Sequence, residues 1–303
     1  MTPMADETAP PEGGGQAGPR LGRPRWGWEL TLVAALALGQ SAVYALVRLI
    51  DMSTRGPLTE AQARLNVEAS PRPWFDLVYQ LLGIGFALVP VLLVLFLLNR
   101  DRVWAATGAD LGGGPVALRG LGFRGSRKAD AVRGEGAADV RPALQRIGFD
   151  LRRRGWDLGT GTLLFLVIGI GTLGVYATGR ALGLTAEILP NNLQAYWWTV
   201  PVLLLSAAKN GILEEVLLLG YGVDRLEKLR LGPWAIIIGL ALFRASYHLY
   251  QGVGPFVGNV LMGLLFGWLY LRWRRVMPFV VAHTLIDAVG FLAPGILAAV
   301  DPL

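Results

Sequence analysis

The chain has 303 residues, of which 53% are hydrophobic and 17% are charged, and it contains no cysteine. Soluble proteins carry about 25% charged residues, whereas here the apolar residues gather in long uncharged runs, such as residues 30–47 and 158–179. Runs of about 18 apolar residues are typical of membrane-spanning helices. The composition therefore excludes a soluble globular enzyme, and these 303 residues can form no disulfide, cysteine nucleophile or Cys-based zinc or iron–sulfur site.

The N-terminal half divides into a tail, two spans, a loop and a third span. Residues 1–25 are rich in Gly and Pro and predict a disordered cytoplasmic tail. Residues 26–99 hold two apolar runs, the first of which is too long for a signal-peptide core. Residues 100–157 are polar and basic and predict a cytoplasmic loop, and residues 158–193 predict a third span with the loop that follows it.

Residues 194–295 predict a core of four helices. Its apolar runs lie near residues 196–222, 233–250, 256–271 and 277–291, and prolines in the first turns of the second and fourth runs are compatible with helices. We therefore predict an all-α, polytopic membrane protein with about seven transmembrane helices. An intramembrane cavity among the last four of them should open toward the cytoplasm.

The distribution of Lys and Arg predicts the orientation and the partners. Of the 28 basic residues, 21 fall in the segments assigned to the cytoplasm and 5 in the opposite segments. This asymmetry predicts a cytoplasmic N-terminus and a multi-pass protein of the cell membrane. Because the basic residues flank apolar runs, the expected partners are membrane lipids, with no nucleic acid.

Ionisable residues interrupt the last four predicted spans. Each such charge costs roughly 2.5–3.5 kcal/mol at bilayer depth, and such groups normally face a protein interior or a wet cavity. Short carboxylates reach the membrane surface poorly, so snorkelling does not explain a glutamate pair. These residues are Lys209, Glu214, Glu215, Arg244, His248, His283 and Asp287.

Helical spacing relates several of these residues. Lys209 precedes the glutamates by five and six positions, which are not the offsets that bring side chains together on a helix. Arg244 and His248 are four apart, as are His283 and Asp287, so each pair should share a helix face. A carboxylate one turn from an imidazole can fix the tautomer of the ring. Arg244 and Asn259 are expected to line the cavity, and the alternative for Asn259 is a helix–helix hydrogen bond.

The run Glu214-Glu215-Val216-Leu217-Leu218-Leu219-Gly220, then His248, then His283-x-x-x-Asp287 resembles the CPBP family. This family of intramembrane endopeptidases includes the type II CAAX prenyl proteases and bacteriocin-processing or self-immunity proteins. The resemblance covers about residues 195–295 and implies that the four-helix core of residues 194–295 is catalytic. Two positions depart from the family pattern: Leu219 stands where the family has Arg, and Arg244 stands four residues before His248, where the family has Phe. Our hypothesis is that Arg244 restores the missing charge from another helix.

The resemblance implies hydrolysis of a peptide bond in a membrane-associated protein or peptide, which can be prenylated. Glu214 would activate water with help from Glu215, and His248 and His283, the latter oriented by Asp287, would stabilise the oxyanion. Glu214, His248 and His283 would also suit a divalent metal, with zinc expected first, as in a metalloprotease. A metal-free site of the same residues stays open.

Two other functions stay open. A non-catalytic scaffold or immunity protein of the same family would explain Leu219, and a proton-coupled transporter would also need intramembrane charges.

The expected site residues lie at different depths along their helices. At 1.5 Å per residue His248 lies about 22 Å from Pro233, whereas the glutamate pair lies about 14 Å from the presumed boundary near Asp224. A tilted or broken fifth helix would reconcile these depths.

Overall fold

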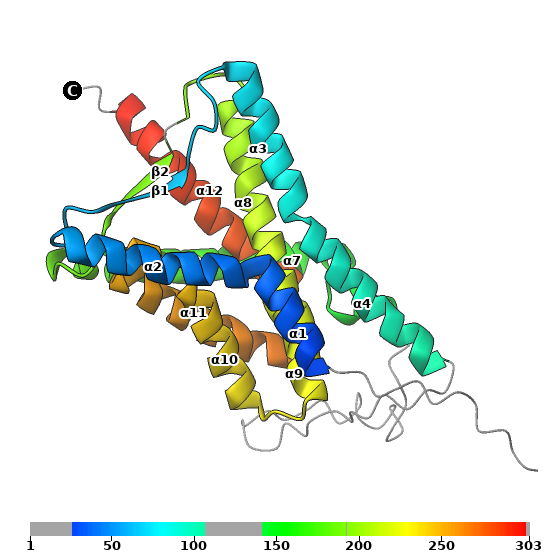
Figure 1. Cartoon of the computed structure of the whole chain (residues 1–303). Helices are drawn as coiled ribbons and strands as arrows, with labels where there is room; N and C mark the ends of the chain where they lie inside the picture. The colour runs from blue at the N-terminus through cyan, green and yellow to red at the C-terminus, as the bar shows by residue number, and fades with distance from the viewer. Residues whose placement is uncertain (1–25, 107–140, 192, 301–303) are drawn as a thin grey trace, which may run out of the picture.

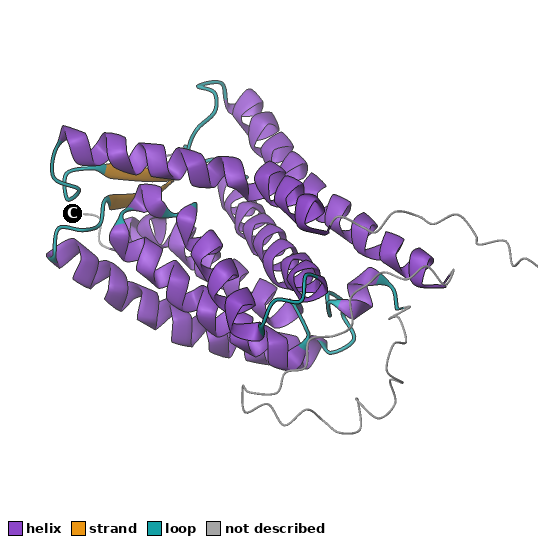
Figure 2. Ribbon diagram, turned by 60° about the horizontal axis from the view of Figure 1, so that its bottom comes forward, coloured by secondary structure: helices purple, strands orange, loops and turns teal. Residues whose placement is uncertain are grey.

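The computed structural model describes residues 26–106, 141–191 and 193–300. The predicted disordered tail and most of the predicted basic loop lie outside these residues. Within them the all-α prediction is confirmed, because 77% of the described residues are helical. Two short strands accompany the helices (Figure 2).

The first two predicted spans form long helices. The π-helical turn η1 (Ala35–Gly39) joins α1 (Trp26–Ala34) to α2 (Gln40–Arg55), and Figure 1 shows α2 turned away from α1 at this point. The second span consists of α3 (Pro73–Ala87) and α4 (Val89–Ala106), with proline tolerated in the first turn of α3. A π turn inserts one residue into the helical ladder, which accounts for the change of direction at η1.

The remaining helices follow in chain order from α6 to α12. After the segment that is not described, the short α6 precedes the long α7, and the last four predicted spans follow. Their bounds are α6 (Ala143–Arg146), α7 (Arg154–Ala181), α8 (Thr199–Glu215), the π helix η2 (Val216–Gly222), α9 (Val223–Lys228), α10 (Pro233–Ser246), the 3₁₀ helix η3 (Leu249–Gln251), α11 (Val253–Trp273) and α12 (Met277–Val300).

In the described part of the chain, four helical segments are long and apolar enough to cross a membrane. They are Trp26–Arg55, Pro73–Asp101, Arg154–Ala181 and Val253–Trp273. Large apolar side chains on the first three of these are exposed, as expected for surfaces that face lipid. The apolar helix α10 is shorter, and α8 carries charges, so the crossing of the membrane by the other predicted spans stays a prediction.

Glycines allow the helices of the core to approach closely. A Cβ on Gly211 of α8 would lie 3.0 Å from the carbonyl oxygen of Val280 in α12, and a Cβ on Gly263 of α11 would lie 2.7 Å from Cα of Ala241 in α10. Small residues at such crossings let helix backbones pack against one another in membranes. These contacts fix α8 against α12 and α10 against α11.

Two short strands, which the sequence analysis did not predict, pair in parallel. Strand β1 (Gln62–Asn66) follows α2 and strand β2 (Glu187–Asn191) follows α7, with Gln62 opposite Glu187. Leu65 of β1 packs against the cluster of Leu203 in α8 and Phe291 in α12. The sheet therefore covers one end of the α8–α12 pair and holds two loops at the same end of the molecule (Figure 1).

A network of ion pairs ties the helices together around α9. The Arg225 side chain is fully buried and donates to Asp101 of α4 at 2.6 Å and to Glu29 of α1 at 2.7 Å. Lys228 also binds Asp101, and Ile147, just beyond α6, is buried in the core. The two described ends of the predicted basic loop are thus packed segments, because paired charges and a buried apolar side chain anchor them.

Candidate active site

Glu215 is the buried centre of a contact between three elements. Its carboxylate is fully buried at the end of α8. Arg244 of α10 donates from Nη2 to Glu215 Oε1 at 2.6 Å, and His283 Nδ1 of α12 lies 2.7 Å from the same oxygen. A buried carboxylate is stable only when it is paired and hydrogen-bonded. The two partners stabilise Glu215 Oε1, whereas Glu215 Oε2 is buried without a hydrogen-bond partner among the described residues. The shared contacts fix α8, α10 and α12 around this carboxylate.

Glu214 differs from its neighbour in exposure and in partner. Its side chain keeps 7% of its surface exposed, and Glu214 Oε2 accepts a hydrogen bond from the Tyr247 hydroxyl at 2.5 Å. The ionisable groups that act electrostatically on Glu214 include His283, His248 and Arg244. Glu214 is thus the less completely buried carboxylate of the pair, and one of its oxygens is held in place by Tyr247.

His248 lies in a turn, and this corrects the expectation that it shares a helix face with Arg244. Helix α10 ends at Ser246, and His248 directly precedes the 3₁₀ helix η3. Its ring lies 4.8 Å from the ring of Tyr247, and its Nε2 atom is buried without a hydrogen-bond partner among the described residues. The chain turns toward α11 here, so the fifth predicted span is broken. Such a break was expected from the different depths of His248 and the glutamates.

The depth of the glutamates is also greater than the sequence suggested. The helix that carries them continues through η2 and α9 to Lys228, so Glu214 lies about 21 Å from that end at 1.5 Å per residue. Asp224, taken as the boundary because of its charge, forms ion pairs with Arg146 and Lys228. The glutamates and His248 therefore lie at similar distances from this end of the bundle.

His283 is held by Glu215 more closely than by Asp287. Its Nε2 atom lies 3.8 Å from Asp287 Oδ1, which is beyond hydrogen-bond distance, while Asp287 Oδ2 accepts a hydrogen bond from Asn210 at 2.7 Å. The family resemblance predicts Asp287 as the orienting group, and Asn210 is a further residue of the site that was not predicted. The signal was present, because Asn210 precedes Glu214 by four residues and so shares its helix face.

Arg244 lies beside the glutamates, where the hypothesis that it replaces the missing positive charge requires it. Its guanidinium contacts Glu215 from another helix and lies 5.6 Å from the centre of the Phe266 ring. Leu219, the residue that replaces the family Arg, is buried in the apolar core within η2. The cation near the glutamates is thus supplied by α10.

Comparison with known families bears directly on this arrangement. Residues 196–289 match the family model described as Type II CAAX prenyl endopeptidase Rce1-like. These residues form an Rce1-like domain. The match begins just before α8 and includes Glu214, Glu215, His248, His283 and Asp287. No curated protein and no solved structure matches the chain.

Asn259, an expected cavity-lining residue, and Lys209, an ionisable residue of α8, form no described hydrogen bond or ion pair with the glutamates of the Rce1-like domain. Asn259 of α11 donates to the carbonyl oxygen of Pro255 in its own helix at 3.0 Å, and no described contact joins it to the glutamates. Lys209 is half-buried on α8, and no acidic group of the described residues lies within ion-pair distance of it.

The described residues offer no group of three His, Cys, Asp or Glu side chains arranged to hold a metal ion. The expected ligand set was Glu214, His248 and His283. In the structure, His283 Nδ1 is turned to Glu215, and Arg244 brings its positive charge to the same oxygen. As these side chains stand, they do not fit a zinc site, which needs three or four ligands directed at one point.

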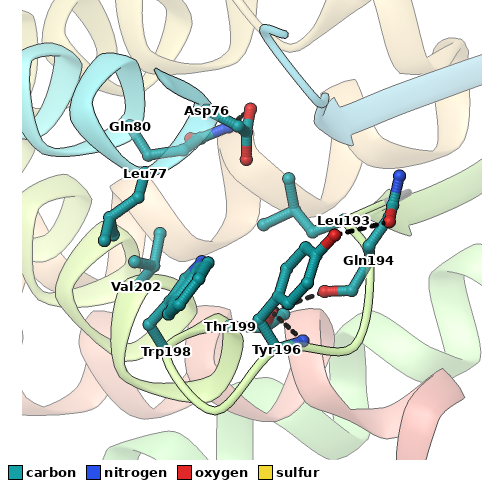
Figure 3. A pocket seen from close by; sticks show the side chains of 9 residues that line it. All are labelled: Asp76, Leu77, Gln80, Leu193, Gln194, Tyr196, Trp198, Thr199 and Val202. Atoms are coloured by element: carbon teal, nitrogen blue, oxygen red, sulfur yellow. Dashed lines mark hydrogen bonds between the residues drawn. The ribbon is translucent and has the colours of Figure 1, made fainter. Parts of the chain in front are cut away.

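A small hollow at the start of the Rce1-like domain lies away from the glutamates. It is lined by residues of α3, α8 and the loop before α8, among them Asp76, Gln80, Tyr196 and Trp198 (Figure 3). The rings of Tyr196 and Trp198 stack with centres 4.8 Å apart. Stacked Trp and Tyr side chains at a helix start are typical of the membrane–water interface. We therefore assign this hollow to the interface and not to the candidate active site.

Proposed function

We propose that the Rce1-like domain is an intramembrane endopeptidase in which Glu214 activates a water molecule. The observation that carries this proposal is the asymmetry of the glutamate pair. Glu215 is fully buried against Arg244 and His283, whereas Glu214 is slightly less buried and has one oxygen fixed by Tyr247 and no other hydrogen bond among the described residues. A positioned carboxylate with a free oxygen is suited to general base catalysis.

The reaction follows from these roles. Glu214 takes a proton from water as the water oxygen attacks the carbonyl carbon of the peptide bond, and the carbonyl oxygen becomes an oxyanion. His248 Nε2, which is buried and has no protein partner among the described residues, donates to that oxygen together with His283. Collapse of the intermediate breaks the C–N bond, and the proton held by Glu214 passes to the leaving amine. Glu215 positions His283 and Arg244 throughout.

The proposed substrate is a membrane-associated protein or peptide, and a prenylated protein is one such substrate. The proposed partners are the lipids that surround the helices. The site is built between helices of a membrane protein, so a substrate must reach it within or beside the bilayer.

The N-terminus is proposed to be cytoplasmic in the cell membrane, because the basic side chains of α9 and of the α11–α12 connection lie at the end from which α1 starts. A metalloprotease mechanism stays an untested prediction of the family resemblance.

The test is cleavage of a membrane-peptide library by the purified chain in liposomes. Glu214→Gln should lower turnover by about 10²–10⁴-fold, which is the contribution expected of a general base. Glu60→Gln, which changes an exposed glutamate before β1, is the matched control and should retain full turnover. Unchanged turnover of Glu214→Gln would contradict the proposal. Proton flux without cleavage would instead support a carrier. The absence of both cleavage and proton flux would support a scaffold.

A further inference from the structure

Polar side chains continue from the glutamates along α8 toward the β1–β2 sheet. Asn210 lies one turn before Glu214 and binds Asp287 of α12, and Ser206 lies one turn earlier still. The Ser206 hydroxyl donates to Asn66 Oδ1 of β1 at 3.2 Å. These side chains are half-buried. They form a polar track, defined here as Asn66, Ser206, Lys209, Asn210 and Asp287, that joins Glu214 to the sheet.

In the other direction along the same helix, the surroundings are apolar and closed. Every residue of η2 (Val216–Gly222) is buried, and its leucines belong to the main hydrophobic core. Water and a peptide backbone need polar partners on their way to a buried carboxylate. In the described part of the chain, the polar approach to Glu214 is therefore from the sheet end, which differs from the cytoplasmic opening expected from the sequence.

Lys209 is the one member of the polar track with a cationic side chain. The acidic groups that act on it most are Asp287 and Glu214, but neither lies within ion-pair distance of its ammonium group. Asp287 is already engaged by Asn210 and faces His283. An ammonium group has three hydrogen-bond donors, and a cation at membrane depth is costly without an anionic partner.

We propose that Lys209 binds a carboxylate group of the peptide substrate, which enters from the β1–β2 end. This inference rests on the proposed peptidase function and adds the class of substrate. Lys209 precedes Glu214 by five residues, or about 7.5 Å along the helix axis. An extended peptide advances about 3.3–3.6 Å per residue. The bound carboxylate therefore lies about two residues from the cleaved bond, as an acidic side chain or as the terminal carboxylate of a substrate that ends there.

The experiment measures kcat/KM for matched peptides that differ only at this position. One peptide carries glutamate there, one glutamine, and one lysine; a second pair ends there in a free carboxylate or in an amide. Wild-type protein should prefer each carboxylate peptide by about 10-fold, chiefly through KM, as expected for a hydrogen bond to a charged group. The two pairs distinguish a side-chain carboxylate from a terminal one.

Variants at Lys209 separate substrate recognition from a structural role. Lys209→Met should remove the preference and Lys209→Arg should keep it, while Lys209→Glu should favour the lysine peptide. Arg64→Met, which removes an exposed cation of β1 at the same end, is the matched control and should leave the preference unchanged. A merely structural lysine would lower the turnover of all peptides equally and would shift no preference.

The outcomes that overturn the inference are distinct from failure of the proposed function. If wild type cleaves the peptides without preferring a carboxylate, or if the preference survives in Lys209→Met, Lys209 is not the recognition residue and the peptidase function stands. If folded wild type cleaves none of the peptides and none of the membrane-peptide library, both proposals fall. The preference of wild type is measured on the unaltered chain, so the test does not depend on the folding of any variant.

Discussion

At the scale of single residues, the two adjacent glutamates have different tasks because different helices face them. Glu215 contacts a guanidinium and an imidazole, whereas Glu214 accepts a hydrogen bond from a phenol. The pair was predictable from the sequence, because the energetic cost of charge at membrane depth singles out such residues. The sequence could support the division of labour only by family resemblance, since the division depends on contacts with Arg244 and His283.

Tyr247 could not be predicted from the sequence, because a tyrosine in an apolar run is an ordinary residue of a membrane protein. The structure gives it a specific role, which is to donate a hydrogen bond to Glu214 Oε2. Sequence distance from the glutamates also hid it, since 33 residues separate the two partners.

Tyr247→Phe tests this role. Removal of a hydrogen bond to a charged group costs about 1.5–3 kcal/mol, so kcat/KM should fall by about 10–100-fold while the ring still fills its site. Peptide-cleavage kinetics in liposomes measure the effect. Tyr44→Phe removes the hydroxyl of an exposed tyrosine on α2 and serves as the control. Equal kinetics for the two variants would show that the Tyr247 hydroxyl does not support Glu214.

At the scale of elements, the long apolar helices were predictable and their ends were not. Length and hydropathy placed α7 and α11 within a few residues, since about 20 apolar residues are needed to cross a bilayer. The strands were missed because each has only five residues. The extent of α4 was missed because Asp101, which reads as the start of a solvated loop, is paired with Arg225 and Lys228.

The close approach of α8 to α12 sets the geometry of the site. A Cβ on Gly211 would lie 2.6 Å from Thr284 Oγ1 and 3.0 Å from the Val280 carbonyl oxygen, so the two helices would have to separate. Gly211 directly follows Asn210, which binds Asp287 across this crossing. The sequence could not reveal this contact, because glycines are frequent in membrane helices of all kinds.

Gly211→Ala should therefore destabilise the protein by about 1–3 kcal/mol and lower its turnover. Thermal unfolding in detergent and peptide cleavage measure the two effects. Gly239→Ala is the matched control, because a Cβ on this glycine of α10 would meet no atom within 4 Å. If both variants unfold and cleave like wild type, the α8–α12 contact does not determine the geometry of the site.

At the scale of the whole molecule, the two ends differ in chemistry. One end carries the ion-pair network around Arg225, and the other carries the β1–β2 sheet and the polar track to Glu214. If the N-terminus is cytoplasmic, the sheet end faces the opposite side of the membrane. The candidate active site is then approached from that side.

Single-cysteine labelling tests this orientation, because the chain contains no native cysteine. Glu60→Cys places a thiol before β1, and Gly232→Cys places one in the exposed connection before α10. A membrane-impermeant maleimide added to intact cells should label the first variant and should label the second only after permeabilisation. The reverse pattern would place the sheet end in the cytoplasm.

The account as a whole depends on water, activated by Glu214, as the nucleophile that cleaves the peptide bond. The direct measurement is a single turnover in ¹⁸O-labelled water, followed by mass spectrometry of the peptide product and of the protein. We predict that the new terminal carboxylate carries one ¹⁸O atom, that the Glu214 carboxylate carries none, and that Glu214→Gln forms no product. An unlabelled product with ¹⁸O in Glu214, or labelled product from Glu214→Gln, would contradict the account.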